Sequence, residues 1–329
     1  MQQPILETRD LKVHFTLKAS DSKKLIAPKR IIKAVDGIDL AIAPAEVLSL
    51  VGESGSGKTT TGKAMLQLVP NVQGEVCFEG KPVVPSDKAG LRAFRQRAQM
   101  IYQDPYQSLN PRDVILDIVA EPLDVNRLVR SEAERRDRVC AALEAAGMTP
   151  AVDYLYRYPY ELSGGQRQRV VIAGAMIMQP AFVVADEPVS MLDASIRTGI
   201  LKLMLGLREQ HELAYLFITH DLSLAWLISD RIAIMYLGRI VEIGPADVII
   251  HHGLHPYAKA LVSIMPVAGK GRSDQRQLLV GETPSATDII KGCDFHTRCP
   301  QAAPICLEQD VRLREVEPGH SVACHLYQL

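Results

Sequence analysis

The sequence predicts an α/β fold in which a mostly parallel β-sheet is covered by helices on both faces. Three observations support this class. Strand-like apolar segments alternate with segments of helical periodicity. A glycine-rich loop follows a short buried strand and opens a helix, and a mostly helical block interrupts the alternation between about residues 91 and 162. A change of composition near residue 251 marks a smaller C-terminal extension.

Length and composition fit a large domain with a smaller appendage. The chain has 329 residues, of which 47% are apolar, yet no uninterrupted apolar run reaches the roughly 18 residues of a membrane span. The net charge of −1 argues against a broad electrostatic surface for nucleic acid. The first residues lack the basic-then-apolar pattern of a secretory signal, so we expect a reducing compartment.

The first part of the chain is predicted to be rich in strands. Leu11–Leu17 and Ile31–Ile42 alternate as strands do, and the basic, polar stretch from Lys18 to Arg30 is predicted to extend their hairpin. Val47–Val51 is predicted to be a short buried strand that leads directly into the glycine-rich loop. Helical periodicity then runs over Lys58–Leu68.

The helical block contains one clear helix start and stop. Ser131 and Glu134 form a capping-box pattern, and Gly147 is placed to end that helix. Strands and helices then alternate again. The predicted elements are helix Gly164–Met178, strand Ala181–Asp186, helix Ala194–Gln210, strand Ala214–Thr219 and a β-rich piece, Arg231–Ile243, that turns at Leu237-Gly238. Beyond residue 251 we expect a short helix ending near Pro266 and a polar linker, Ala268–Arg276.

The glycine-rich loop carries the strongest chemical signal. Gly52-Glu53-Ser54-Gly55-Ser56-Gly57-Lys58-Thr59 fits G-x-x-x-x-G-K-[ST] between a strand and a helix. Its glycines allow backbone angles that turn N–H groups toward phosphates. Lys58 is expected to reach the β and γ phosphates, the Thr59 hydroxyl to ligate Mg²⁺, and Thr60 to belong to the same nucleotide-binding set. The flanking elements disfavour an ordinary turn with an incidental lysine.

Two adjacent acids end a predicted buried strand. A buried strand does not normally end in Asp186-Glu187 unless a cation or a reacting group lies at its edge. Asp186 is therefore a candidate Mg²⁺ ligand, and Glu187 is a candidate general base for an attacking water. Taken alone, the pair is equally compatible with two solvated loop acids; the phosphate loop favours the catalytic interpretation.

A second anion site is predicted at Ser163-Gly164-Gly165-Gln166, which opens a helix. Backbone N–H groups, the helix dipole and a serine hydroxyl converge there. Two phosphate sites of different design in one domain suggest that this one serves a nucleotide held mainly by another subunit.

In their order and spacing these segments resemble the ABC ATPases from about residue 5 to residue 250. The resemblance implies a P-loop ABC-type nucleotide-binding domain over residues 1–250, with an antiparallel β part and a helical subdomain at about 91–162. Gln103 follows a predicted short apolar strand, Gln99–Tyr102, and the resemblance assigns it as a Mg²⁺ and water sensor. It also assigns His220 as the switch residue beside the γ phosphate, and Phe15 as the aromatic that stacks on adenine. Asp193, which also suits the N-cap of the next helix, falls on the loop that crosses the dimer.

The extension, residues 251–329, resembles that of oligopeptide/dipeptide importer ATPases. The resemblance rests on Leu254-His255-Pro256-Tyr257, on Gly292–Pro300, and on Pro318-Gly319-His320 followed by Cys324-His325. Nickel, glutathione, opine and some sugar importers share this extension, so the solute is left open between peptide and these alternatives.

Four cysteines in the tail have the spacing C-x5-C-x6-C-x17-C: Cys293, Cys299, Cys306 and Cys324. Structural zinc sites favour C-x2-C pairs, which are missing, whereas iron–sulfur clusters accept more varied spacings. Related importer ATPases are associated with a [4Fe–4S] cluster at matching cysteines, so the resemblance implies such a cluster. Zinc and uncoordinated thiols remain the alternatives.

The resemblance implies an ATPase, using ATP and Mg²⁺, that energises a membrane ABC permease from the cytoplasmic face of the inner membrane. The expected partners are a second, related ATPase subunit, two permease subunits and, indirectly, an extracytoplasmic binding protein; no nucleic acid is expected. Two other functions stay open. One is a soluble ABC machine acting on DNA or ribosomes, and the other is an ABC scaffold for iron–sulfur assembly.

Overall fold

The structure is a computed structural model that describes residues 3–17, 30–265, 279, 281–285, 287–288 and 290–327. The chain divides into two compact units. The first contains Met1–Leu6, Ile42–Glu46 and Phe78–Phe217, and the second contains Glu7–Ala41, Val47–Cys77 and Ile218–Leu329. Each unit is therefore built from segments that are distant in the sequence.

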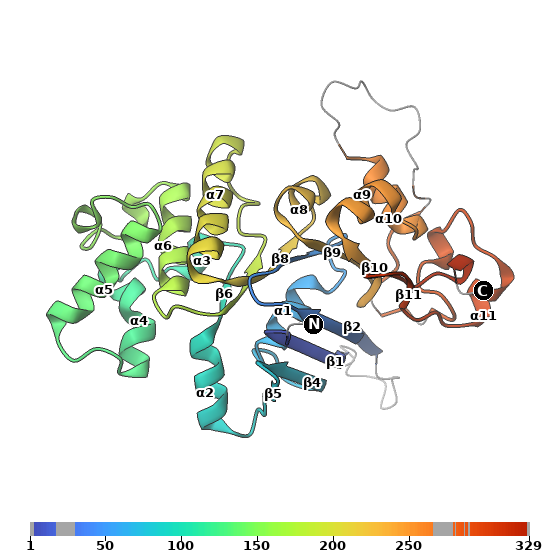
Figure 1. Ribbon diagram of the computed structural model, residues 1–329, viewed down its shortest axis with the longest axis horizontal. Coiled ribbons are helices and arrows are strands. Elements are labelled where there is room, and N and C mark those ends of the chain that lie inside the picture. Colours follow the sequence, from blue (N-terminus) through green and yellow to red (C-terminus); the bar gives the residue numbers. More distant parts are fainter. Residues whose placement is uncertain are drawn as a thin grey trace, which may run out of the picture. The chain divides into compact units, whose positions relative to one another are not determined.

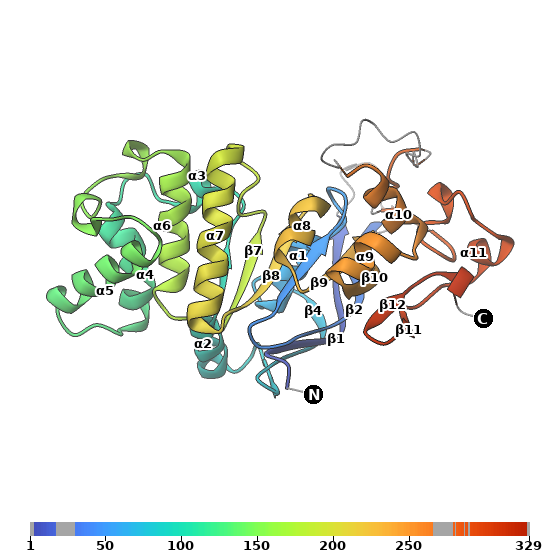
Figure 2. The ribbon, with the colours of Figure 1, turned by 45° about the horizontal axis from the view of Figure 1, so that its top comes forward.

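The main sheet of the second unit has the strand order β11-β12-β10-β9-β3. β3 (Val47–Val51) pairs in parallel with β9 (Arg231–Tyr236), which pairs antiparallel with β10 (Arg239–Pro245). The hairpin of β11 (Arg314–Glu317) and β12 (His320–Val322) extends this sheet because β12 pairs with β10, as Figure 1 and Figure 2 show in red and orange. The C-terminal extension thus shares a sheet with the strand that precedes the phosphate loop.

The predicted turn between β9 and β10 is confirmed. Leu237 and Gly238 both have positive φ angles, 43° and 84°, which is the conformation of a two-residue hairpin turn whose twist matches that of the strands. Glycine is also required for space at the second position, because a Cβ atom there would lie 2.7 Å from the carbonyl oxygen of Lys33.

A second sheet and several α-helices belong to the described part of the second unit. The sheet has the order β2-β1-β4, from β1 (Leu6–Leu17), β2 (Arg30–Ile42) and β4 (Val72–Phe78). The helices are α1 (Lys58–Met65), α8 (Leu222–Ile228), α9 (Ala246–His252), α10 (Pro256–Ser263) and α11 (Pro304–Glu308). One apolar core joins β9, α9, α10 and Phe295.

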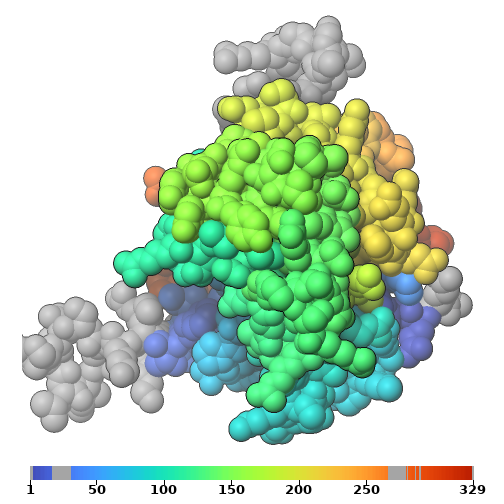
Figure 3. Space-filling model, turned by 90° about the vertical axis from the view of Figure 1, so that its left-hand side faces the viewer, coloured from blue at the N-terminus to red at the C-terminus, as the bar shows by residue number. Residues whose placement is uncertain are grey.

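The first unit combines a parallel strand pair with a helical layer. β6 (Ala98–Ile101) pairs in parallel with β7 (Phe182–Asp186), and β8 (Ala214–Thr219) begins in this unit and ends in the other. The short β5 (Lys81–Pro82) follows β4. The helices are α2 (Lys88–Arg97), α3 (Pro105–Ser108), α4 (Ile115–Asn126), α5 (Glu132–Ala145), α6 (Gly164–Met176) and α7 (Ala194–His211). Figure 3 looks onto α4, α5 and α6, in shades of green, which enclose an apolar core of their own.

The predicted α/β class is confirmed, and the short strand predicted at Gln99–Tyr102 is present as β6. Two details differ. The strand β4 and the hairpin β11–β12 were not predicted. At α5, the Ser131 hydroxyl accepts from the Glu134 N–H as expected, but the Glu134 carboxylate accepts from Arg130 N–H instead of completing the box.

Two predicted segments, Lys18–Arg30 (apart from Arg30 itself) and Ala268–Arg276, lie outside the described residues. The boundary predicted at residues 250 and 251 stays a prediction. Within the described ranges, none of the helices has both the length and the apolar character needed to cross a bilayer.

Candidate functional site

The phosphate loop joins β3 to α1 in the second unit and is shaped by close backbone contacts. A Cβ atom on Gly52 would lie 2.2 Å from the carbonyl oxygen of Met235, and one on Gly57 would lie 2.0 Å from that of Ala34. Gly57 also has a φ of 104°, which disfavours any side chain. The loop is therefore packed against neighbouring strands at both ends, and glycine is required at both positions.

Lys58 directs its positive charge back into this loop. Its side chain is buried, and Nζ donates hydrogen bonds to the carbonyl oxygens of Gly52 (2.8 Å) and Glu53 (2.9 Å). An ammonium held inside a glycine-rich loop can neutralise bound phosphates. The geometry is therefore that of an anion cradle with its own counter-charge.

Glu53 ties the loop to the C-terminal extension. Its backbone N–H donates to the Tyr257 hydroxyl (3.0 Å), and its carboxylate accepts two bonds from the Arg298 guanidinium (2.9 and 3.1 Å) and one from the Thr283 hydroxyl. Burial acts to raise the pKa of Glu53, but the bonds from Arg298 and Thr283 outweigh it and hold that pKa below its usual value. Glu53 is therefore a paired carboxylate.

In the first unit, the predicted base and the predicted sensor meet at the carboxyl edge of the parallel pair β6–β7. The register sets Ile101 opposite Ala185, so Gln103 and Glu187 each follow two residues later. Gln103 Nε2 donates a hydrogen bond to Glu187 Oε2 at 3.1 Å. The structure therefore brings these two side chains together.

The two adjacent acids have different surroundings. Asp186 ends β7 and is 3% exposed, whereas Glu187 is half-buried. Glu187 has a φ of 45°, an uncommon conformation for a non-glycine residue. The chain thus changes direction directly after the strand. As a result the Asp186 carboxylate is buried, whereas the Glu187 carboxylate is accessible to solvent.

The turn Ser163–Gln166 opens α6 with a reciprocal capping box. Ser163 Oγ accepts from the Gln166 N–H (3.3 Å), and Gln166 Oε1 accepts from the Ser163 N–H (2.9 Å). A Cβ atom on Gly165 would lie 2.6 Å from Cγ2 of Ile196 on α7, so a side chain does not fit there. The predicted helix N-terminus is present, and Ser163 is exposed on it.

The remaining predicted residues lie at element ends. His220 is exposed after β8, next to Asp221, which caps α8 by accepting from two backbone N–H groups. Asp193 occupies the N-cap position of α7, as predicted, although its carboxylate makes no capping hydrogen bond. Phe15 is half-buried in β1. The phosphate loop, His220 and Phe15 belong to the second unit, and the other predicted ATP-site residues belong to the first.

Burial and neighbouring thiols raise the pKa values of three of the four tail cysteines. Burial raises the pKa of Cys293 to about 12, and the nearby thiols of Cys306 and Cys324 act in the same direction. The pKa values of Cys299 and Cys324 are raised by burial and also by Cys306. The N–H of Cys293 donates to the carbonyl oxygen of Cys306 (2.8 Å). Among the described residues, however, no three His, Cys, Asp or Glu side chains form a group that could hold a metal ion.

The fold and the site together define a P-loop ATPase of the ABC type. The ABC transporter family model matches residues 35–190, and the model described as "Oligopeptide/dipeptide transporter, C-terminal region" matches residues 241–306. The chain is 44% identical to the putative oligopeptide transport ATP-binding protein YkfD of Bacillus subtilis (strain 168), over 99% of this chain and 96% of that protein. It is 43% identical to the oligopeptide transport ATP-binding protein OppF of Escherichia coli (strain K12), over 97% and 95%. The chain therefore belongs to the ATP-binding proteins of the ABC transporter family.

Solved structures agree with this assignment. The ABC transporter component cbiO1 of Clostridium perfringens is 25% identical, with a TM-score of 0.62 over 77% of this chain and 93% of that one. The ATP-binding cassette MJ0796, solved as a dimer in a post-hydrolysis state bound to ADP and Pi, is 27% identical, with a TM-score of 0.62 over 73% and 98%.

Sequence reasoning missed Tyr257, Thr283 and Arg298 as neighbours of the phosphate loop. Tyr257 and Arg298 lie 204 and 245 residues from Glu53 in the chain. Neither local periodicity nor motif spacing reports such a contact. The sequence feature that could have indicated these contacts is Glu53 itself. A carboxylate inside an anion-binding loop would repel phosphates unless a positively charged side chain neutralised it.

Gly52→Ala is expected to abolish ATP binding, because the added methyl group cannot fit against the Met235 carbonyl. Gly55→Ala is the matched control. Gly55 has a φ of 79° but no neighbour within 4 Å of its Cβ position, so that variant should lose only about 1 kcal/mol to backbone strain. Titration calorimetry with ATP and urea unfolding measure both effects. Equal ATP affinity in the two variants would contradict this account of the loop.

Proposed function

We propose that the chain is the ATP-hydrolysing subunit that energises import of di- and oligopeptides through a membrane ABC permease. The observation that carries the proposal is the 3.1 Å contact between Gln103 and Glu187, beside the buried Asp186, in a chain that also has an intact phosphate loop. This is the arrangement of an enzyme that hydrolyses its nucleotide and does not merely bind it.

The chemistry is in-line attack of water on the γ phosphate of ATP, and the protein contributes positioning and charge neutralisation. Glu187 accepts the proton of the attacking water, and Gln103 orients both. His220 contacts the γ phosphate, Lys58 neutralises the β and γ phosphates, and Phe15 stacks on adenine. The carboxyl group of Glu187 is well suited to this role because it is half-buried and hydrogen-bonded to an amide that carries no charge.

The residues proposed to hold Mg²⁺ carry oxygen groups of the kind that this ion prefers. The Thr59 hydroxyl, the Gln103 amide and the buried Asp186 carboxylate are the hard oxygen donors that Mg²⁺ prefers. When bound, the ion would neutralise negative charge on the phosphates. Asp186 is suited to such a cation because its buried carboxylate ends β7 directly before Glu187.

The Ser163–Gln166 turn acts on the ATP of a second ATPase subunit, with Asp193 on the loop that links the two sites. The exposed Ser163 and the helix N-terminus support this role, since they offer an anion site to a molecule outside the first unit. We infer a related but non-identical partner. ATP binding then closes the dimer, and hydrolysis reopens it.

Peptide is favoured over nickel, glutathione, opine or sugar as the solute. Two Bacillus subtilis proteins at 44% and 42% identity and an Escherichia coli protein at 43% are all named as oligopeptide transport ATP-binding proteins. Such a subunit works on the cytoplasmic face of the inner membrane, bound to two permease subunits that a binding protein supplies with solute. Nearly full-length similarity to these proteins also disfavours a DNA-linked, ribosome-linked or cluster-assembly ABC protein.

The four tail cysteines are proposed to hold a [4Fe–4S] cluster. Structural zinc sites favour C-x2-C pairs, which the spacing of these cysteines lacks. A four-iron cluster instead takes one thiolate at each of four irons. The hydrogen bond from the Cys293 N–H to the Cys306 carbonyl oxygen supports the proposal, as do the thiols that contribute to the raised pKa values of Cys293, Cys299 and Cys324. A bound cluster would supply a cross-link between chain segments.

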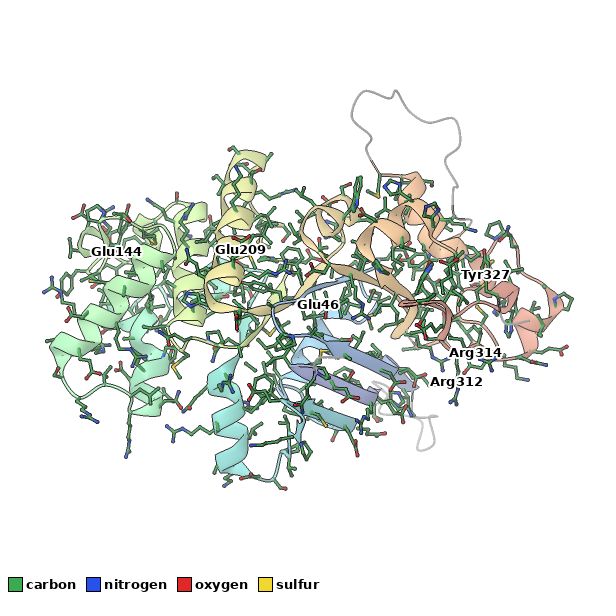
Figure 4. The ribbon with its side chains drawn as sticks, in the orientation of Figure 1. Glu46, Glu144, Glu209, Arg312, Arg314 and Tyr327 are labelled. Carbon is green, nitrogen blue, oxygen red and sulfur yellow. The ribbon has the colours of Figure 1, made fainter. Side chains whose placement is uncertain are left out.

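Glu187→Gln is expected to bind ATP normally, to lower hydrolysis by about 100-fold or more, and to trap the closed dimer, because the base is lost while the charge cradle remains. Steady-state ATPase rates, ATP titration and gel filtration with ATP measure the three effects. Glu209→Gln, on the exposed part of α7 labelled in Figure 4, removes a similar carboxylate and should change none of them. Hydrolysis at the wild-type rate in Glu187→Gln would remove Glu187 as the base.

The solute is tested by transport. Membrane vesicles that contain this chain, its partner ATPase, the permease subunits and the binding protein are expected to take up labelled di- and oligopeptides only with ATP inside. Glu187→Gln should abolish that uptake. ATP-driven uptake of Ni²⁺, glutathione or a sugar, with none of peptide, would overturn the peptide assignment while leaving the transport ATPase intact.

The cluster is tested by anaerobic purification. A cluster-bearing protein is expected to be brown, with visible absorbance that falls on reduction and disappears when Cys306 is replaced by Ser. A colourless protein with stoichiometric zinc, or with four thiols that react freely with a thiol reagent, would contradict the proposal.

A further inference from the structure

We propose that the C-terminal extension is a working part of the nucleotide site: Arg298 and Tyr257 are positioning residues that hold the phosphate loop, through Glu53, in the shape that binds ATP. The proposal rests on the assignment of residues 52–60 as the ATP site, and it adds two residues that act through the loop without touching the nucleotide.

The first contact is an ion pair of favourable geometry. Arg298 donates to both carboxylate oxygens of Glu53, from Nη1 at 2.9 Å and from Nη2 at 3.1 Å. Arg298 is only 8% exposed, and its Nη1 also donates to the Thr283 hydroxyl at 3.1 Å. Paired donation to a carboxylate fixes orientation as well as distance, and shielding from water strengthens it.

The second contact fixes the backbone. The Glu53 N–H donates to the hydroxyl of Tyr257, a fully buried residue of α10. This N–H therefore faces the extension and not the space inside the loop. The hydroxyl accepts one bond at the point where the chain leaves β3 and begins to turn.

The extension side of these contacts is rigid. The rings of Tyr236, Tyr257 and Phe295 pack against one another with centroids 4.9, 5.2 and 5.4 Å apart, and the Arg298 guanidinium lies 5.9 Å from the Tyr236 ring centre. The turn before α10 is also anchored, because the fully buried Glu242 of β10 accepts from the N–H groups of Leu254 and His255. A support of this kind can hold the loop before ATP arrives.

Electrostatics explains why the support matters for ATP and not only for folding. Glu53 places a negative charge in a loop that must accept triphosphate, and like charges at close range repel strongly. The Arg298 guanidinium neutralises that charge by pairing directly with the Glu53 carboxylate. Loss of Arg298 should therefore weaken ATP binding in two ways: the loop becomes more mobile, and the Glu53 carboxylate is left without its positive partner. The residues proposed for hydrolysis in the first unit should be unaffected.

The test is a double-mutant cycle on the full-length chain, read by ATP titration and by KM and kcat. Arg298→Gln is expected to weaken ATP binding by about tenfold or more and to raise KM far more than it lowers kcat. Glu53→Gln added to Arg298→Gln should recover part of the loss, because the unpaired charge is gone. Arg298→Lys should recover part of it as well. Arg314→Gln removes an exposed arginine of the same extension, labelled in Figure 4, and should bind ATP like the wild type.

Three results would overturn the proposal. The first is an ATP affinity of folded Arg298→Gln within twofold of that of Arg314→Gln. The second is that the effects of Arg298→Gln and Glu53→Gln on ATP affinity simply add in the double variant. The third is that Arg298→Gln lowers kcat and leaves KM unchanged. If Arg298→Gln does not fold, Tyr257→Phe decides the matter. It keeps the packed ring, removes only the acceptor oxygen, and should weaken ATP binding by about fivefold; unchanged affinity would reject the proposal. Wild-type binding of ATP reports separately on the assignment of the site, so failure of the two ideas is distinguishable.

Discussion

The phosphate loop is held from outside, and the rest of the site depends on that constraint. The loop is rich in glycine, the residue that loses the most conformational entropy on folding. In isolation the loop would therefore be conformationally flexible. Gly52 packs against the backbone of β9, Gly57 packs against that of β2, and the N–H of Gly238 donates to the carbonyl oxygen of Ser56. These backbone contacts hold the loop at Gly52, Ser56 and Gly57, and the segment at Glu53 between them is held by other contacts.

The extension adds side-chain contacts to these backbone contacts. It reaches the loop because β12 joins the sheet that contains β3. The buried side chains of Glu242 on β10 and His320 on β12 also connect these two strands, with 2.8 Å between Glu242 Oε1 and His320 Nε2. An appendage attached only by a flexible linker would not place Tyr257 and Arg298 within hydrogen-bond distance of Glu53. The same sheet thus supports nucleotide binding and anchors the four-cysteine tail.

Local sequence predicted the backbone motifs of the site and missed its long-range contacts. The phosphate loop, the strand ending in Asp186-Glu187 and the Ser163 turn were recognisable because each motif lies within a few consecutive residues. Parallel pairing accounts for the meeting of Gln103 and Glu187, since each follows its strand by two residues. The contacts of Glu53 span more than 200 residues and left no local signal.

The sequence also failed to predict short or irregular strands. β4 has buried positions only at Val76 and Phe78, and an interior glycine breaks its alternation. β12 has three residues and is recognised as a strand through its pairing with β10 and β11. Asp193 shows a different limit: it has the residue type and position of a helix cap, but its carboxylate does not make the bond.

The central claim is that the loop is shaped by the extension before nucleotide binds. Hydrogen exchange resolved to single amides tests it directly, in the full-length chain without nucleotide. The Glu53 amide should be protected in the wild type, because it donates to the Tyr257 hydroxyl, and should lose that protection in Tyr257→Phe. A Glu53 amide that exchanges in the wild type as fast as a freely exposed one would contradict the account.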